Sequence, residues 1–402
     1  MNTRRRTLLA AVAACSFLAS AQAQKKYDPG VSDSEIVLGM PMPLSGPVSA
    51  YGIVGRVAEA HFKQVNDAGG INGRKVRLII YDDQYSPPKT VEVARRLVEQ
   101  DQVFAIFGNL GTAPNLAIQR YMNAKKVPQL FVQSGAGKLN DHKAYPYTVP
   151  FLASYQGEGR AYAQNILRTR PNAKIAVLLQ NDDMGREVLK GLKAGLGDKA
   201  ATMIVAEATY EPTDPMVDSQ VIGLKASGAD VLVDVSTARF AAQAIRKVAD
   251  LGWKPDHYLN LAAASVKLAF VPAGVDKAVG VMSLATFKEP DNERWAADAD
   301  VKAYRAMLQK YAPDVDANVG TGVMGYIAAQ LMEHVLREAG DQLTRDRVRD
   351  LASNLKDVKP KMLLPGVTVG NSPDDLHVFS VLQPVRFSGK DLEPSGPLLK
   401  LK

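Results

Sequence analysis

The sequence has few of the residues from which most catalytic and metal sites are built. It holds one cysteine, Cys15, and five histidines among 402 residues. A single cysteine excludes an internal disulfide and any cysteine-rich zinc or iron–sulfur site. The histidines lie far apart, and the G-x-S-x-G, H-E-x-x-H and G-x-G-x-x-G patterns are absent. We therefore expect a protein that is not an enzyme and that uses neither a metal nor a cofactor.

Long uncharged hydrophobic runs are also scarce. The one clear case, residues 8–19, follows three arginines at 4–6 and precedes the small-residue pattern of 21–23. This order is typical of a secretory signal peptide, which predicts cleavage after Ala23 and export from the cytoplasm. The run is too short for a membrane span, which takes about 20 residues. Loss of the leader would lower the formal net charge from +7 to +4, without a basic stripe, so we expect no nucleic-acid partner.

Two features of this leader leave alternatives open. Residues 3–9 are compatible with a twin-arginine export signal as well as with the general secretory route. Cys15 follows Val12-Ala13-Ala14 and could accept a lipid anchor. The apolar core continues beyond this cysteine to residue 19, which favours cleavage after Ala23 over lipid attachment.

The rest of the chain alternates short β-branched runs with segments of helical periodicity. The first series predicts strands at 36–40, 76–81, 103–107 and 127–132, with helices at 50–65, 91–98 and 115–123. The second series predicts strands at 175–179, 203–207 and 231–235, with helices at 161–167, 187–196, 217–225 and 240–251. A strand at 279–285, helices at 295–311, 322–339 and 346–355, and a strand-rich tail at 365–387 follow. Alternation of this kind predicts α/β lobes, each with a parallel sheet covered on both faces.

Two loops that follow predicted strands are candidates for ligand contact. Gly111-Thr112-Ala113-Pro114 combines a natural N-cap with a proline in the first helical turn. A helix N-terminus with a hydroxyl beside it suits a carboxylate. Gly135, Ala136 and Gly137 lack bulky side chains, so their backbone N–H groups could approach a ligand. Ordinary turn formation explains both loops equally well.

Several longer motifs resemble those of one protein family. They are Leu44-Ser45-Gly46-Pro47, Tyr51-Gly52, Gly69-Gly70-Ile71-Asn72-Gly73, Tyr81-Asp82-Asp83, Gly108-Asn109-Leu110-Gly111-Thr112 and Asn181-Asp182 with Gly185. In this order they resemble the periplasmic leucine/isoleucine/valine-binding proteins, which are receptors of ABC importers. The resemblance extends from Ser34 to Phe387, and it is strongest to a branch often assigned to aromatic or other organic acids.

The resemblance implies an α/β fold of two Rossmann-like lobes joined by three hinge strands. We place the hinge strands near 148–153, 282–287 and 361–366. The predicted boundaries assign residues 1–23 to the signal peptide, 24–149 and 286–362 to lobe 1, and 150–285 and 363–402 to lobe 2. A ligand would bind between the lobes and stabilise their closed arrangement. The implied partners are a small-molecule carboxylate and the membrane permease of an ABC importer, and we expect a monomer.

The resemblance also implies a set of binding residues. The predicted ligand contacts are Tyr51, Leu110, Gly111, Thr112, Gly135, Ala136, Gly137, Tyr155, Met184, Thr237 and Leu261. Thr112 keeps a hydroxyl of the family's carboxylate clamp, whereas Gly137 stands where amino-acid receptors have a hydroxyl residue. Met184, Thr237 and Leu261 replace two tyrosines and the acid that pairs with the ligand's ammonium.

With Leu261 in place of the acid, the ammonium group of an amino-acid ligand would have no partner. Burying an unpaired ammonium costs free energy, so such a ligand would bind poorly. We therefore expect a small organic acid without an α-ammonium, possibly aromatic. One alternative is a receptor of the same type for branched-chain or other amino acids. Another is a sensor that reports ligand occupancy to a membrane signalling partner.

Overall fold

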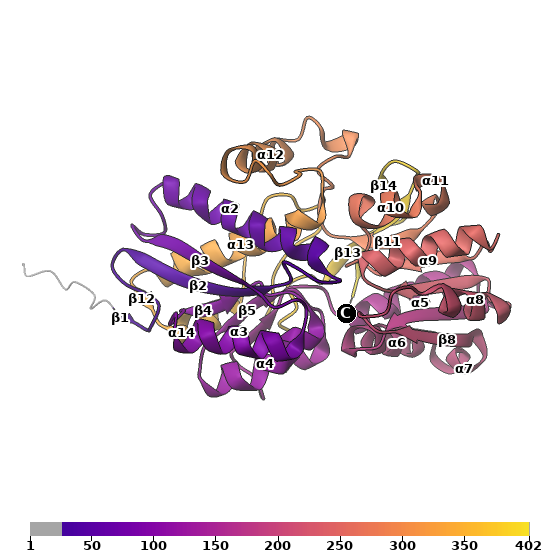
Figure 1. The fold of residues 1–402 in the computed structure, drawn as a ribbon, viewed down its shortest axis with the longest axis horizontal. Helices are drawn as coiled ribbons and strands as arrows, with labels where there is room; N and C mark the ends of the chain where they lie inside the picture. Colours follow the sequence, from indigo (N-terminus) through magenta and orange to yellow (C-terminus); the bar gives the residue numbers. More distant parts are fainter. Residues whose placement is uncertain (1–25, 402) are drawn as a thin grey trace, which may run out of the picture.

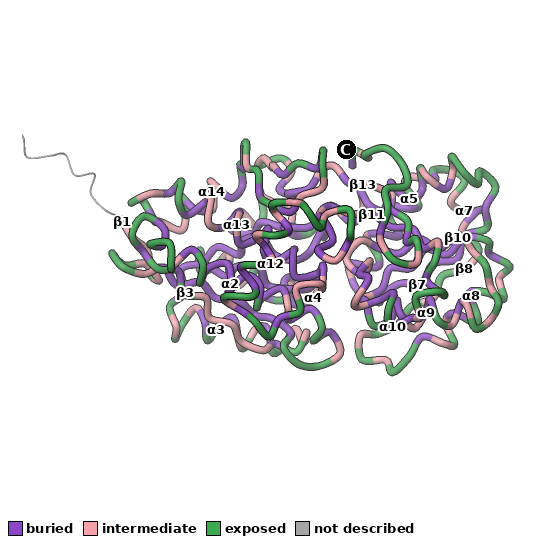
Figure 2. The backbone as a smooth tube through the Cα atoms, turned by 90° about the horizontal axis from the view of Figure 1, so that it is seen from above, coloured by how far each residue is buried: buried purple, intermediate pink, exposed green. Residues whose placement is uncertain are grey.

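A computed structural model describes residues 26–401, so the predicted signal peptide and Cys15 lie outside the described residues. Two lobes lie side by side, with the C-terminus between them (Figure 1). Buried backbone is concentrated inside each lobe, and exposed segments cover the outside (Figure 2). Each lobe is therefore built around its own core, as the two alternating series predict.

The first lobe contains a five-stranded sheet in which every neighbouring pair is parallel. Its order is β3 (Lys75–Asp82), β2 (Glu35–Met42), β4 (Ala105–Phe107), β5 (Gln129–Val132) and β6 (Thr148–Pro150). The three inner strands are buried almost throughout, which explains their continuous apolar sequences.

Helices cover both faces of this sheet. On one face α2 (Ile53–Asp67) packs against α13 (Thr321–Ala339), and on the other α3 (Pro87–Glu99) packs against α4 (Thr112–Ala124). Val37 of β2 belongs to the core formed with α3 and α4, whereas its two neighbours belong to the core formed with α2 and α13. Side chains of a strand alternate between the two faces, so one strand serves both cores. The smaller elements of this part of the chain are β1 (Lys26–Tyr27), η1 (Ser49–Gly52), η2 (Gly137–Asn140), η5 (Glu293–Trp295), α12 (Ala299–Tyr311), β12 (Gln342–Leu343) and α14 (Arg345–Ala352).

The second lobe contains a larger, mixed sheet. Its order is β14 (Leu392–Pro394), β13 (Val381–Phe387), β11 (Met282–Ala285), β10 (Asp256–Leu259), β9 (Val231–Val235), β7 (Ile175–Gln180) and β8 (Ile204–Tyr210), with β15 (Leu399–Lys400) also paired to β13. The strands from β11 to β8 are parallel, and β13 runs antiparallel to its neighbours.

Helices again lie on both faces. α5 (Tyr155–Thr169) packs on α6 (Asp183–Leu196), and α8 (Asp218–Ala226) packs on α9 (Ala238–Asp250). The smaller elements are η3 (Gly197–Lys199), α7 (Ala200–Met203), η4 (Val266–Phe270), α10 (Val271–Ala273) and α11 (Val275–Ala278). The α/β class is confirmed, and so is a parallel arrangement for the first sheet and for β11 to β8 of the second; the antiparallel strands at the edge of the second sheet come from the end of the chain.

The chain passes between the two sheets in three places. It leaves β6 and enters α5, leaves β11 for the first lobe, and returns to β13. The last two passages run together, because the Lys288 amide donates to the Met362 carbonyl (2.8 Å) and the Leu364 amide donates to the Thr286 carbonyl (3.0 Å). These passages fall within or beside the predicted hinge strands, and the lobe boundaries themselves stay a prediction.

The tail differs from the predicted strand-rich segment. Between 365 and 380 it forms only isolated bridges, and regular pairing begins at β13. Here the Leu376 amide donates to Asn140 Oδ1 (2.6 Å), and His377 Nε2 lies 3.1 Å from the Gly135 carbonyl oxygen. Part of the tail that was predicted for lobe 2 thus packs against residues predicted for lobe 1.

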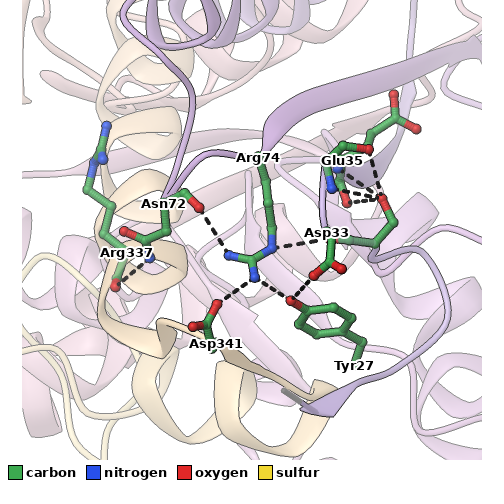
Figure 3. A network of polar contacts seen from close by, with 9 residues as sticks. Tyr27, Asp33, Glu35, Asn72, Arg74, Arg337 and Asp341 are labelled. Carbon is green, nitrogen blue, oxygen red and sulfur yellow. Dashed lines mark hydrogen bonds and ion pairs between the residues drawn. The ribbon is translucent and has the colours of Figure 1, made fainter. Parts of the chain in front are cut away.

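Arg74 anchors the far end of the first lobe through a buried guanidinium group (Figure 3). It donates to the carbonyls of Ser32 (3.1 Å) and Asn72 (3.3 Å), to the Tyr27 hydroxyl, and to the Asp341 carboxylate (2.5 Å). The group joins β1, the turn before β3 and the segment after α13. Because each guanidinium nitrogen has a partner and one partner is a carboxylate, the buried charge is compensated.

Candidate functional site

A small cavity of about 40 Å³ lies where the two lobes meet. Its walls come from both lobes and consist of Val48, Tyr51, Tyr85, Leu110, Gly111, Thr112, Gln133, Leu152, Tyr155, Met184, Ser236, Thr237, Ala262 and Met324. The structure thus brings seven of the predicted contacts together: Tyr51, Leu110, Gly111, Thr112, Tyr155, Met184 and Thr237. Their role in binding stays a prediction. The volume suffices for a few water molecules, so the lobes are closed upon one another.

Three helices begin at this cavity. Thr112 opens α4, Met184 lies in the first turn of α6, and Thr237 directly precedes α9. Free backbone N–H groups and the helix dipole make such positions favourable for an anion. Gly111 has a φ of +102°, and a Cβ there would lie 2.3 Å from a Tyr85 ring carbon, so glycine is required at this position.

Hydroxyl groups supply much of the remaining polarity. Thr112 Oγ1 lies 2.8 Å from Ser134 Oγ and 3.3 Å from the Tyr155 phenol oxygen. Burial raises the pKa of Tyr155 to about 12, and it also raises the pKa values of Tyr51 and Tyr85 above their usual value. All three phenols are therefore neutral at physiological pH and keep a proton to donate.

Two buried polar side chains in the wall have no partner among residues 26–401. Gln133 is 3% exposed and both of its amide atoms are unpaired, while Ser236 is fully buried and its hydroxyl is unpaired. Buried polar groups normally carry hydrogen bonds, and leaving one unpaired costs about 1–3 kcal/mol. These two residues, from opposite lobes, could contact a ligand. Our sequence analysis missed both, although each directly follows a strand at the ligand-binding edge of its sheet.

No wall residue carries a charge. Asp182, outside the wall, helps to raise the pKa values of the wall residues Tyr85 and Tyr155. Asp182 is engaged as the N-cap of α6, since it accepts from the Gly185 amide (3.2 Å), and it also accepts from Gln180 Nε2 (2.7 Å). An ammonium group in the cavity would therefore find no charged side chain in the wall itself.

The glycine loop is not part of the cavity wall. The carbonyl oxygen of Gly135 accepts from the Tyr155 amide (3.1 Å), and a Cβ on Gly135 would lie 1.9 Å from the Ala153 carbonyl oxygen. Ala136 is fully buried, and the Gly137 amide donates to Glu187 Oε2 at 2.7 Å. The amides of Ala136 and Gly137 thus donate to groups of the protein itself, Ala136 to Ser134 Oγ at 3.3 Å and Gly137 to Glu187.

Leu261 also lies outside the main cavity. It lines a neighbouring cavity of about 10 Å³, and its amide donates to Glu158 Oε1 (2.6 Å). The next residue, Ala262, lines the main cavity instead, and its carbonyl accepts from the Tyr51 hydroxyl (3.0 Å). Leu261, the residue predicted to stand in place of the family's acid, therefore lies outside the main cavity, and its neighbour Ala262 lines it.

Other polar clusters have structural partners. His61 lies 2.8 Å from Glu333, and His257 lies 3.3 Å from Asp234. Asp82 accepts from the Leu44 amide (2.9 Å) and organises a turn. Residues 26–401 contain no group of three or more His, Cys, Asp or Glu side chains placed to hold a metal ion. Within the same part of the chain, no helix has the length and apolar character that a membrane crossing needs.

Comparison with known proteins shows which family this chain resembles. Residues 35–386 match the family model described as "Periplasmic binding protein". Among curated proteins, Leu/Ile/Val-binding protein homolog 7 of Brucella abortus is 24% identical over 232 residues, which cover 56% of this chain. The match spans 58% of that relative's own length.

Solved structures show the same fold. A branched-chain amino acid ABC transporter protein from Thermus thermophilus with bound valine has a TM-score of 0.81 at 18% identity, covering 92% of this chain and 97% of its own. A fatty acid ABC transporter substrate-binding protein from Thermomonospora curvata has a TM-score of 0.78 at 19% identity, covering 94% and 96%. At these identities the likeness concerns the fold alone.

Proposed function

Since this chain belongs to the periplasmic binding protein family, we propose that it captures a small organic acid without an α-ammonium and delivers it to an ABC importer. The family consists of solute receptors that work with ABC transporters, and its name places them in the periplasm. The observation that carries the finer proposal is the cavity wall, which combines three helix N-termini with no charged side chain.

The polar groups of the wall suit a carboxylate. Thr112, Ser236 and Gln133 can each donate a hydrogen bond, and the start of α4 adds backbone donors of positive partial charge. At the start of α9 the Thr237 and Ala238 amides already donate to Tyr210 and Tyr51, so this end contributes its dipole. Neutral donors and helix ends stabilise a carboxylate without a buried counter-ion. The amide of Gln133 can also accept, which would allow a second polar group on the ligand.

The apolar part of the wall indicates the body of the ligand. Tyr51, Tyr85 and Tyr155 contribute rings from both lobes, and Met184 contributes a flexible thioether. Rings arranged around a small cavity favour a planar or aromatic body, and methionine adapts to irregular shapes. The closed cavity is smaller than such a ligand, so binding would require the lobes to open and to close again around it.

Of two alternatives of the same fold, the amino-acid receptor differs from our proposal in the ligand that it binds, and the sensor differs only in its membrane partner. The solved relatives include proteins whose descriptions name valine and a fatty acid, so the fold accommodates acids with and without an ammonium. A sensor for a membrane partner would bind its ligand in the same cleft. We favour the des-amino acid because an ammonium group would lack a counter-charge in the wall.

The test is a thermal-unfolding screen of protein stripped of ligand by unfolding and refolding. Matched probes are 4-methylpentanoate against leucine, and 3-phenylpropionate against phenylalanine. Ligand at about 1,000 times its Kd adds roughly 4 kcal/mol to stability, which gives a clear shift of Tm. We expect stabilisation by the carboxylates only. Stabilisation by the amino acids would show that the ammonium has a partner and would overturn the proposal.

Variants of Thr112 locate the site. Thr112→Val removes the hydroxyl at nearly constant volume and should weaken the carboxylate by about tenfold, the usual cost of one hydrogen bond to a charged group. Thr112→Ser keeps the hydroxyl and should bind normally. Equal affinity of the two variants would place the carboxylate elsewhere.

A further inference from the structure

A second cavity, about 460 Å³ in volume, lies beside the passages between the lobes. Its wall includes Ala285 at the end of β11, Phe287 in the passage that follows, and Val385 of β13. It shares no wall residue with the cleft described above. Its volume falls in the range of sites for small molecules, about 300–1,000 Å³.

Glu289 is the unusual residue in this wall. It is 8% exposed, and among residues 26–401 no donor or cation contacts its carboxylate. The group lies against Gly320, where an added Cβ would be 1.9 Å from Glu289 Oε2. An ionised carboxylate in such a place is costly unless a cation or donor reaches it. Burial, reinforced by Asp291 and Asp391, raises the pKa of Glu289 to about 8.

The charges around Glu289 are mostly negative. Asp391 and Glu393 line the same cavity, and the only cationic side chain in the wall is Arg294, whose guanidinium lies 4.9 Å from the Trp295 ring centroid. Nearby charges are already paired: Lys288 with Asp298 and Asp300, Asp291 with Lys267, and Glu293 with Lys390. The wall thus has three acidic side chains and one guanidinium, and it carries net negative charge whenever Glu289 is ionised.

We propose that this cavity binds a small organic cation, a primary alkylammonium whose nitrogen meets Glu289 and whose apolar body packs on Phe287 and Trp295. The ammonium would supply the donors that Glu289 lacks, and the aromatic rings favour the apolar body of the ligand. Arg294 and Lys288 already lie over the Trp295 ring, at 4.9 and 5.6 Å from its centroid, so the charge is recognised by Glu289. An organic cation fits better than a metal ion, because the described residues hold no cluster of metal-ligating side chains. The proposal is independent of the ligand in the cleft.

The experiment uses Trp295 as a reporter. The chain has two tryptophans, so Trp253→Phe leaves Trp295 as the only one. We would titrate this variant with n-butylammonium chloride and, in parallel, with sodium butyrate and n-butanol, while following tryptophan fluorescence. Saturable binding of butylammonium alone is expected. Equal responses to the three probes, or no saturable response to butylammonium, would overturn the proposal.

Two substitutions in this background test the role of Glu289. Glu289→Gln removes the charge at constant volume and should weaken butylammonium binding by at least tenfold. The matched control Glu293→Gln removes a neighbouring acid that pairs with Lys390 outside the cavity wall, and it should bind as the parent does. Circular dichroism checks that both variants are folded. Unchanged binding by the folded Glu289→Gln variant would overturn the proposal.

The pH dependence gives a second readout. Binding requires the ionised carboxylate of Glu289, so affinity should rise by about tenfold per pH unit between pH 6 and 8 and then level off. Asp291, Asp391, Glu393, Arg294 and Tyr304 also face this region; of these, Asp391 has a pKa raised mainly by burial. Glu289→Gln should therefore remove most of the pH dependence. A dependence that persists in this variant would assign the cation to another acid and overturn the proposal.

Discussion

The phenol oxygen of Tyr51 accepts a hydrogen bond from the amide of Ala238, 3.0 Å away, although 187 positions separate the two residues. The same hydroxyl donates to the Ala262 carbonyl at 3.0 Å. Tyr51 belongs to the first lobe, and both of its partners belong to the second. One buried side chain therefore bridges the lobes twice and stabilises the closed arrangement directly.

We expect Tyr51→Phe to shift the protein towards an open arrangement. The change deletes two hydrogen bonds that exist only when the lobes meet, each worth about 1 kcal/mol, and it leaves the Ala238 amide and the Ala262 carbonyl free to bind water after opening. Small-angle scattering should show a larger radius of gyration without ligand. Tyr121→Phe is the control, because the Tyr121 hydroxyl bonds to Glu99 within one lobe. A radius unchanged by Tyr51→Phe would show that other contacts hold the lobes closed.

Gln133 should display opposite effects on stability and binding. Gln133→Leu removes a buried amide with no partner in the described chain, so the free energy of unfolding without ligand should rise by about 1–3 kcal/mol. If Gln133 contacts the ligand, the same change should weaken binding. Chemical unfolding and calorimetric titration with the acid found in the screen measure the two quantities.

Gln129→Leu provides a matched comparison for this prediction. Gln129 is fully buried, and its Nε2 donates to Asn115 Oδ1 at 2.7 Å. Gln129 Nε2 has partners although Oε1 has none among residues 26–401, so losing these hydrogen bonds should leave Gln129→Leu less stable than Gln133→Leu. A loss of stability in both variants would mean that Gln133 has partners in solution that the closed structure does not show.

The fold was predictable where local sequence patterns are sufficient. Continuous apolar strands such as β2 and β9, and amphipathic helices such as α9, follow from side-chain periodicity. β10 was missed because its sequence, Asp256-His257-Tyr258-Leu259, is half polar. His257 is accommodated in the sheet by Asp234 of β9, a partner that no local pattern reveals.

The site was predictable to a smaller extent, for a similar reason. Thr112 and Thr237 follow strands at the edge where parallel sheets bind ligands, and the structure brings both into one cavity. The glycine loop follows a strand as well, but the Gly137 amide is taken by Glu187, fifty residues further along the chain. Contacts between the lobes decide which backbone N–H groups remain available to a ligand. The local sequence around Gly137 or Glu187 does not reveal these contacts.

Glu187 should act as a latch at the edge of the cleft. Its carboxylate accepts from the Gly137 amide of the other lobe at 2.7 Å, beside an ion pair of 3.0 Å between Lys138 and Asp183. Glu187→Ala should speed ligand release by about three- to tenfold, because a charge-assisted hydrogen bond that closes the lobes is lost. Stopped-flow dissociation measures the rate. Glu207→Ala is the control, since Glu207 pairs with Lys193 within the second lobe, and equal rates in the two variants would contradict the prediction.

The free energy of unfolding should depend on pH through Glu289. Burial raises the pKa of Glu289 from 4.5 to about 8 in the folded protein, so the folded state favours the protonated carboxyl. The contribution of Glu289 to the free energy of unfolding is therefore fully present below pH 4.5, and it is lost as the pH rises through 8. The shift corresponds to a loss on the order of 5 kcal/mol. The N-terminus of α13 beside Gly320 reduces this loss, because the helix dipole favours the ionised carboxylate. Urea unfolding of the parent and of Glu289→Gln at pH 5, 7 and 9 isolates this group from the others that titrate. The two proteins should have similar stability at pH 5, and the variant should be the more stable one at pH 9; parallel pH profiles would contradict the assignment.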